Sequence, residues 1–210
     1  EIIDQYGADA LRFSLVMGIS PGNDTRFSTE KVEMARNFAN KVWNASRFVL
    51  MNLDGEETLE GKKLLLPDQW ILTRYNEAVA EISAHFEEAD YGLAAQKIYD
   101  FIWSEFCDWY IELAKGGLLG EDMSRKAAVR AVLQHVLSGL LRLLHPFMPF
   151  ITEEIYQAIP HECESIVIES YPEYDPTLNY KEDEGHIDRI ITGSATPVNK
   201  ELKLEAGSEL

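Results

Sequence analysis

The stretch from Ser28 to Leu53 reads STEKVEMARNFANKVWNASRFVLMNL and contains neither Pro nor Gly. Ser28 is a favourable N-cap residue, and Glu30 follows close to the positive end of the expected helix. At about 100° per residue, small and apolar side chains gather on one face, which suits close packing against other helices. The stretch therefore predicts the amphipathic helix around which the rest of the chain is organised. Its apolar face consists of Val32, Ala35, Phe38, Ala39, Val42, Trp43, Ser46, Val49, Leu50 and Leu53.

The opposite face of this helix combines amides and cations with one large aromatic ring. Such side chains can hold unstacked RNA bases, because a ring stacks on a base, amides bond to base edges and a cation attracts phosphate. Alternatively, Phe48 packs against a neighbouring helix and the amides are merely solvated. Periodicity identifies faces rather than ligands, so the pattern alone favours this second interpretation. The face consists of Asn37, Asn40, Lys41, Asn44, Arg47 and Phe48.

The rest of the chain predicts more helices and one short strand. Residues 164–170, ESIVIES, alternate loosely between apolar and polar and indicate the strand. Residues 121–145 have nearly continuous apolar spacing and are expected to form the central helix. The fold class is therefore all-α, an antiparallel helical bundle with a short C-terminal strand. The further helical segments are residues 4–18, 67–88, 90–115, 121–145 and 149–160.

Individual residues are expected to begin, end or brace these helices. Asp68 is placed to cap the helix at 67–88. Gly116 and Gly117 are expected to stop the preceding run of helical spacing. In the first helix, Asp9 and Arg12 are spaced for a surface ion pair of small value.

The segment 90–115 carries an aromatic stripe, for which bundle core is the favoured interpretation and a ligand pocket the alternative. Glu105, Asp108 and Glu112 lie outside the stripe. We expect them to form a solvated face rather than a catalytic pair, because nothing apolar surrounds them to shift a pKa. The stripe consists of Ile98, Ile102, Trp103, Phe106, Trp109, Tyr110 and Leu113.

The net charge of −17 argues at first against a nucleic-acid binder, because phosphate contacts dominate that affinity. The distribution weakens this objection. Residues 1–52 hold six acidic and six basic residues, whereas residues 53–120 hold fourteen and five. A local basic face on the helix at 28–53 is therefore compatible with the composition.

No motif for catalysis occurs in the sequence, neither a Gly-rich phosphate loop nor a nucleophile spaced with a base. The five His are scattered and Cys107 and Cys163 share no motif spacing, so we predict no metal site and a reduced, cytoplasmic setting.

No segment approaches the roughly 20 apolar residues of a membrane helix, so no membrane contact is expected. The chain does not begin with Met, and EIIDQYGADALRF is expected to belong to the middle of a longer protein.

Three segments resemble a known family. RFSTEKVEMARNFANKVWNASRFVLMNL, residues 26–53, resembles the opening of the anticodon-binding domain of bacterial valyl-tRNA synthetases. YGADALRF resembles the helix after the KMSKS loop of these class I enzymes. LLHPFMPFITEEIYQAIP resembles a segment shared by the valyl, leucyl and isoleucyl enzymes. The resemblance covers about residues 1–175, and NFANKVWNASRF favours valine over the other two.

The resemblance implies the C-terminal part of an ATP-dependent valine–tRNA ligase. Residues 1–27 would then be the junction with the catalytic half, residues 28–162 the anticodon-binding bundle, and residues 163–210 a strand and polar tail. The HIGH and KMSKS signatures are absent, so we expect no catalytic residue and no cofactor here, with ATP and Mg bound by the full-length enzyme. The expected partner is a valine-accepting tRNA, with no DNA partner, and the protein is expected to be monomeric.

Within the family, positions matching Lys41 and Phe48 are associated with anticodon contact, which agrees with the polar face found from the periodicity. Asn37, Asn44 and Arg47 complete the expected RNA-binding residues. Two alternatives stay open: the bundle of an isoleucyl- or leucyl-tRNA synthetase, and a helical protein-interaction module without an RNA role.

The C-terminal tail departs from the family pattern. Family members continue into a C-terminal coiled coil, whereas this chain ends HIDRIITGSATPVNKELKLEAGSEL without sustained heptads. Residues 192–210 therefore suggest a truncated or rearranged tail, and contacts of the family's coiled coil with tRNA are not expected to carry over.

Overall fold

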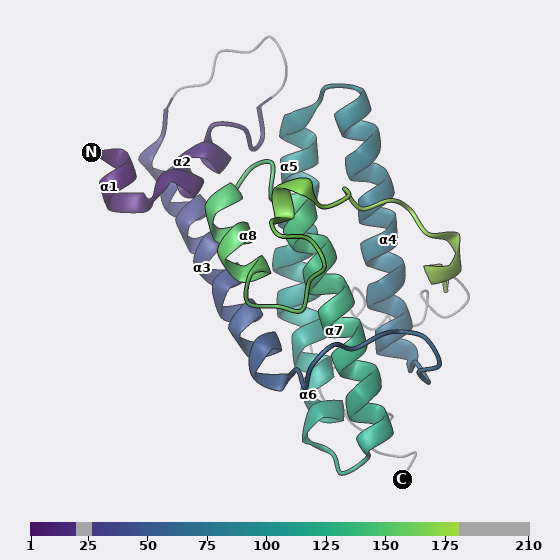
Figure 1. Cartoon of the computed structure of the whole chain (residues 1–210). Helices are drawn as coiled ribbons and strands as arrows, with labels where there is room; N and C mark the ends of the chain where they lie inside the picture. Colours follow the sequence, from purple (N-terminus) through teal and green to yellow (C-terminus); the bar gives the residue numbers. More distant parts are fainter. Residues whose placement is uncertain (20–26, 181–210) are drawn as a thin grey trace, which may run out of the picture.

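Four long helical rods run alternately up and down in the computed structural model of the chain, which describes residues 1–19 and 27–180 (Figure 1). The rods are α3, α4, the continuous run α5–η1–α6, and α7, so the predicted antiparallel bundle is confirmed. The tail that departs from the family pattern lies outside the described residues. The elements are α1 (Ile2–Tyr6), α2 (Ala8–Ser14), α3 (Thr29–Asn52), α4 (Leu66–Glu87), α5 (Tyr91–Asp100), η1 (Phe101–Tyr110), α6 (Ile111–Leu119), α7 (Met123–Leu144), α8 (Pro149–Tyr156), η2 (Ile166–Ile168) and η3 (Pro176–Leu178).

The central rod is α7, as the apolar spacing predicted. It packs against α3, α4, α5, α6 and α8, and Leu133 and Leu137 are fully buried. By length and composition α7 would also pass as a membrane span, contrary to the expectation that no segment approaches one. However, 67% of its apolar window is buried inside the bundle. Its hydrophobic side chains are therefore accounted for by packing inside the protein.

The first predicted helix, residues 4–18, is in fact two short helices. Gly7 separates α1 from α2 with φ of +88°, a left-handed conformation that glycine adopts without steric cost. Asp9 is buried, and its carboxylate accepts hydrogen bonds at 3.3 and 2.7 Å from two backbone amides in the first turn of α8. Arg12 donates to two backbone carbonyls just before α8. The expected surface pair is therefore wrong, because both side chains hold α2 against α8.

The third rod continues where the sequence predicted a stop. Gly116 and Gly117 lie inside α6, and Gly120 is its C-cap. A Cβ on Gly117 would lie 2.8 Å from Cγ2 of Val129 in α7. Glycine at this position therefore lets α6 and α7 approach closely rather than ending the helix.

Asp68 caps α4 from its third residue, and not from the N-cap position, and it also joins three rods. It is the third residue of α4, fully buried, and accepts a hydrogen bond at 2.9 Å from the backbone N–H of Leu65, the N-cap residue. Tyr110 of η1 donates to the same carboxylate at 2.9 Å, and Arg125 of α7 forms a bidentate pair with it. Burial, reinforced by Asp68, raises the pKa of Tyr110 well above its usual value. This network fixes the lower end of the bundle.

The strand expected at residues 164–170 is wrong, and no β-strand occurs in residues 1–19 or 27–180. Ile166–Ile168 instead form the 3-10 helix η2. The hydroxyl of Ser165 accepts from the backbone N–H of Val167 at 3.3 Å, and Glu153 of α8 accepts from that of Ile166 at 3.1 Å. These local bonds satisfy the backbone groups that a strand would need a partner strand to satisfy.

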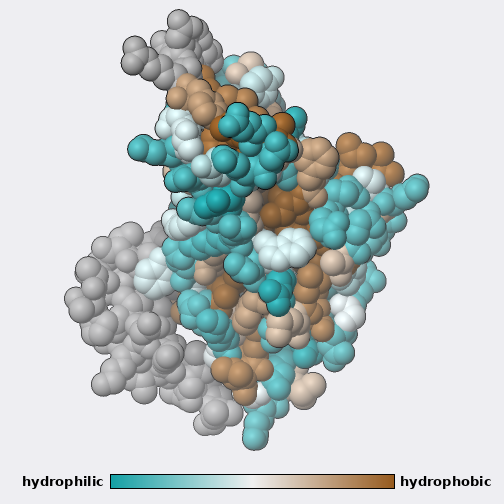
Figure 2. All heavy atoms as spheres, turned by 90° about the vertical axis from the view of Figure 1, so that its left-hand side faces the viewer, coloured by the Kyte–Doolittle hydropathy of each residue, from teal (hydrophilic) through white to brown (hydrophobic). Residues whose placement is uncertain are grey.

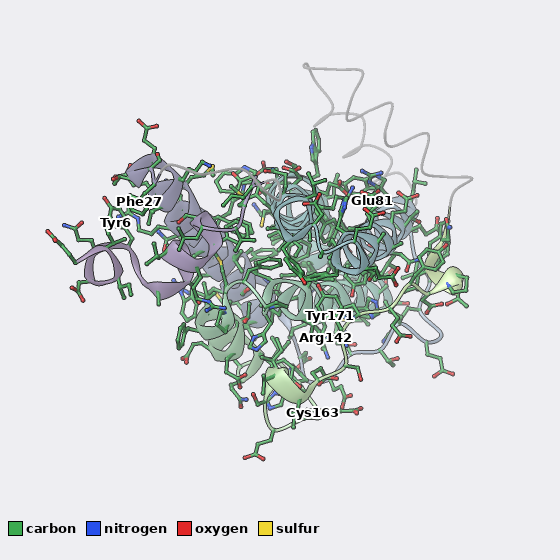
Figure 3. The ribbon with its side chains drawn as sticks, turned by 90° about the horizontal axis from the view of Figure 1, so that it is seen from above. Tyr6, Phe27, Glu81, Arg142, Cys163 and Tyr171 are labelled. Carbon is green, nitrogen blue, oxygen red and sulfur yellow. The ribbon has the colours of Figure 1, made fainter. Side chains whose placement is uncertain are left out.

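Beyond η2 the chain returns across α7 and α4 (Figure 1). Tyr171 donates to the carbonyl of Leu143 at 3.3 Å, and Arg142 lies beside it in Figure 3. Further on, Asn76 of α4 exchanges two hydrogen bonds with the backbone of Asp175, at 2.6 and 2.8 Å. The segment is thus attached to the bundle by side chains and not by a sheet.

Candidate nucleic-acid interface

The outward face of α3 presents the amides that the sequence assigned to it. Asn37, Asn40, Asn44 and Arg47 are exposed, at successive turns of the helix. None of these four side chains has an ion pair or side-chain hydrogen bond with another of the described residues. Figure 2 views the molecule from the side along which α3 runs in Figure 1, and hydrophilic residues there are interspersed with hydrophobic ones. The face therefore offers free donors and acceptors along its length, and we call these four residues the amide stripe.

Trp43 borders the amide stripe, which corrects its assignment to the apolar face. Its side chain is 41% exposed. It follows the buried Val42 directly, so it is turned by about 100° from the centre of the packed face. There the neighbouring helices no longer cover α3. An exposed indole next to amides is a suitable surface for stacking a base.

Lys41, on the other flank of the stripe, is held by the third rod. Its Nζ lies 2.5 Å from Oδ1 of Asp108 and 3.7 Å from the centre of the Trp103 ring, and its side chain is 23% exposed. Trp103 in turn stacks on Tyr99, with ring centroids 5.5 Å apart and planes at 18°. An ion pair and a cation–π contact thus fix the ammonium group before any ligand arrives.

The π-helical segment η1 explains how Trp103 and Asp108 reach the same lysine. In an α-helix, residues five apart differ by about 140° in direction, because each turn takes about 3.6 residues. The wider π-helix bonds residue i to i+5, which brings such residues onto one face. The sequence interpretation of Asp108 as part of a solvated face is therefore incomplete. Glu105 is also paired, with Arg74 of α4 at 2.9 Å.

Phe48 combines features of both predicted roles, packing against a neighbouring helix and presenting a ring at the surface. Its ring is partly buried and packs against the hydrophobic core, but it still reaches the surface. Nζ of Lys115, from α6, lies 5.9 Å from the ring centre, and Lys115 pairs with Glu112 at 2.6 Å. The ring therefore belongs to the junction of α3 with the third rod, about two turns below Lys41.

A pocket of about 410 Å³ lies at the upper end of the amide stripe, between α1, α2, α3 and α8. Arg36 and Asn40 line it from α3, and Tyr6 and Phe150 line it from the other elements. The guanidinium of Arg36 lies 5.3 Å from the centre of the Tyr6 ring. The stripe thus ends in a hollow that is lined by two aromatic rings, a guanidinium and the carboxylate-bearing Asp9.

The structure brings together the sequence-predicted residues and adds others. Asn37, Asn44 and Arg47 share one exposed face, with Lys41 and Phe48 on its flank. The sequence missed Trp103, Asp108 and Lys115 as members of the site. With 3.6 residues per turn, Trp103 and Asp108 point in different directions, so the α-helical pattern does not bring them together. Their five-residue spacing fits a π-helix, and it is the one signal in the sequence that could have indicated their proximity.

Comparisons with known proteins agree on one family. Residues 68–209 match the family described as the anticodon-binding domain of tRNA ligase. The valine–tRNA ligase of Clostridium acetobutylicum is 53% identical over 194 residues, which cover 91% of this chain and 22% of that protein. That of Oceanobacillus iheyensis is 45% identical over 217 residues, covering 97% of this chain and 25% of that protein, so the alignment takes in α3. The chain thus spans about a fifth to a quarter of the length of these curated relatives.

Solved structures with the same fold include two kinds of synthetase. The LeuRS–tRNA–LeuAMS ternary complex of Agrobacterium radiobacter K84 superposes with a TM-score of 0.66 at 18% identity, over 85% of this chain and 21% of that chain. Methionyl-tRNA synthetase of Mycobacterium tuberculosis superposes with a TM-score of 0.59 at 20% identity, over 73% of this chain and 32% of that one. At these identities the similarity concerns the fold alone.

Proposed function

Because the chain belongs to the anticodon-binding domain family of tRNA ligases, we propose that it is the part of a valine–tRNA ligase that binds the anticodon arm of a valine-accepting tRNA. Identities of 45–53% to valine–tRNA ligases over nearly the whole chain support valine as the amino acid. The proposed partner is tRNA, bound by a monomer in the cytoplasm.

The observation that carries the proposal is the amide stripe on α3. Its exposed side chains have no partner among the described residues, and two aromatic rings, Trp43 and Phe48, flank it. Proteins read the bases of single-stranded RNA loops by stacking them on aromatic rings and by bonding to their edges. The anticodon loop of a tRNA is such a single-stranded loop.

A titration with fluorescently labelled tRNAs at low salt tests the proposal. We expect valine tRNA to bind more tightly than isoleucine or leucine tRNA. A preference for either of these would indicate the corresponding synthetase, and equal failure of all three would favour a helical protein-interaction module.

A pair of variants locates the site. Arg47→Ala should weaken binding and make its salt dependence shallower by about one ion, if Arg47 contacts phosphate. Lys97→Ala is the matched control, because Lys97 pairs with Glu81 between α4 and α5 and lies outside the stripe. An affinity and a salt dependence that both stay unchanged in Arg47→Ala would remove Arg47 from the interface.

For the whole protein, we propose ATP- and Mg-dependent attachment of valine to tRNA, with this chain inactive by itself. The absence of both ATP-binding signatures from its sequence supports this proposal. Valine-dependent exchange of pyrophosphate into ATP should therefore stay at background for the purified chain. Exchange above that of a mock purification would contradict the proposal.

A further inference from the structure

An exposed carboxylate stands next to the amide stripe, where a nucleic-acid interface would be expected to lack one. The side chain of Asp108 is 52% exposed and lies against Lys41, the cation on the flank of the stripe. Opposite charges attract and like charges repel, so this group weakens any contact of Lys41 with phosphate. Asp108 is therefore expected to have a role other than supporting a contact with phosphate.

Asp108 uses only one of its two oxygens within the protein. Oδ1 lies 2.5 Å from Nζ of Lys41, and Oδ2 has no hydrogen bond with any residue in the ranges 1–19 and 27–180. The Trp103 ring holds Lys41 from below at 3.7 Å, and the stacked Tyr99 backs that ring. The carboxylate is therefore oriented, with a free acceptor turned away from the lysine.

We propose that Oδ2 of Asp108 accepts a hydrogen bond from the exocyclic amino group of one anticodon-loop base, so that Asp108 determines base specificity. The proposal rests on the proposed function, since it requires the α3 face to bind the anticodon arm. An ionised carboxylate is an acceptor only. It can therefore pair with an amino group of adenine, cytosine or guanine, and it repels the carbonyl oxygen that uracil presents in place of the cytosine amino group.

Lys41 complements this selection. Because its ammonium lies beside the carboxylate, the pair offers a donor and an acceptor next to each other. A base edge with an amino group next to a ring nitrogen or carbonyl acceptor matches both. The same pair discourages phosphate, which would meet the negative charge of Asp108, so the face favours base edges at this point.

Asp108→Asn tests the assignment because it keeps the shape of the side chain and changes the pattern of donors. The amide oxygen must face the donor Lys41, so the NH₂ group takes the place of Oδ2 and meets the base amino group donor to donor. Glu81→Gln is the matched control: it removes the same charge from a carboxylate of similar exposure, 54%, which pairs with Lys97 outside the stripe.

The probe is an RNA hairpin with the anticodon arm of a valine-accepting tRNA, and a set of hairpins in which each loop base in turn lacks its exocyclic amino group. We expect the unsubstituted chain to bind one member of the set about tenfold more weakly than the parent hairpin. Asp108→Asn should bind those two hairpins equally, whereas Glu81→Gln should retain the tenfold difference. The melting temperature of Asp108→Asn should stay unchanged, because exposed pairs contribute little to stability.

The results separate this inference from the proposed function. If the parent hairpin binds but no missing amino group matters, or if Asp108→Asn keeps the full discrimination, Asp108 is a positioning residue for Lys41 and the inference is overturned. If the parent hairpin does not bind the chain at all, the proposed function fails and the inference fails with it.

Discussion

Phe48 contributes to the hydrophobic core and also reaches the surface that we propose for RNA. Its ring packs against core residues on one side and lies 5.9 Å from Lys115 on the other. A stacking role and a packing role are therefore not exclusive, and each affects a different measurement. Substitutions can separate them, because an aliphatic side chain replaces the packing but not the aromatic face.

We predict that Phe48→Leu and Phe48→Ala weaken binding of the anticodon hairpin by a similar amount, about 1–3 kcal/mol, the scale of a base–aromatic stack. In urea unfolding, Phe48→Ala should cost more than Phe48→Leu, and less than the 3–5 kcal/mol of a fully buried Phe→Ala change. Unchanged affinity of Phe48→Leu together with loss of stability in Phe48→Ala would make Phe48 a packing residue only.

Asp68 is a second residue for which a single substitution tests one interaction, here the contribution of a buried ion pair to stability. Its fully buried carboxylate accepts hydrogen bonds from Tyr110, Arg125 and the backbone of Leu65. Asp68→Asn leaves the guanidinium of Arg125 without its ionised partner, so the free energy of unfolding should fall by about 2–4 kcal/mol. Glu112→Gln, which breaks an exposed pair, should cost less than about 0.5 kcal/mol in the same urea titration. Equal losses would mean that the buried network contributes no more than a surface pair.

At the scale of elements, the third rod shows how local geometry and packing combine. Its π-helical part turns Phe106 and Tyr110 into the core, whereas Trp109, expected in the middle of the buried stripe, is only partly buried. The same change of pitch turns Asp108 towards α3. A helix with 3.6 residues per turn throughout could not place all of these residues at once.

The contact between α4 and α7 depends on a glycine. A Cβ on Gly139 would lie 2.0 Å from the hydroxyl oxygen of Tyr75, whose pKa burial raises to about 12. Gly139→Ala should therefore lower the free energy of unfolding by about 1–3 kcal/mol, despite the better helix propensity of alanine. Gly116→Ala is the matched control, because its Cβ would meet nothing within 4 Å and it should be neutral or stabilising by up to about 1 kcal/mol. Thermal unfolding of both variants measures the difference. If Gly139→Ala is as stable as the parent chain, α4 and α7 can move apart to accommodate the added methyl group without a loss of stability.

At the scale of the whole molecule, the stability should depend on pH through His135. Burial lowers the pKa of His135 below its usual 6.5, Arg142 lowers it further, and Asp175 opposes the shift; the ring also packs edge-on against Tyr75. The folded state therefore prefers the neutral ring. The contribution of the neutral His135 ring to the free energy of unfolding is complete above about pH 6.5. It is lost as the pH falls from 6.5 towards the lowered pKa of His135 in the folded state.

We predict that the free energy of unfolding falls between pH 7 and pH 5, by at most about 1.4 kcal/mol per pH unit for this one proton, and that the melting temperature falls with it. His135→Gln should reduce this slope to the part that remains from His145, whose pKa burial also lowers. Differential scanning calorimetry at pH 7, 6 and 5 measures the slopes directly. The same slope in His135→Gln and in the parent chain would assign the effect to other groups.

Sequence patterns determined the helical rods and the face that one of them exposes. The periodicity of residues 28–53 predicted α3 with its outward amides, and the apolar run at 121–145 predicted the central α7. Asp90 caps α5 and accepts a hydrogen bond from the backbone N–H of Leu93 at 3.2 Å. These features depend on neighbours within about one helical turn, which is why a linear pattern contains them. The sequence similarity to the family then indicated tRNA as the partner to propose.

Only the tertiary structure decided what each polar residue on those helices does. Asp9 was expected in a surface pair and Asp68 as a helix cap, and both are buried because amides and cations from distant parts of the chain surround them. The short strand did not form, because Ile166–Ile168 satisfied their backbone groups locally. Lys41 became a fixed group because a wider helix brought Trp103 and Asp108 against it. Burial and pairing depend on groups far away in sequence, so local periodicity cannot supply them.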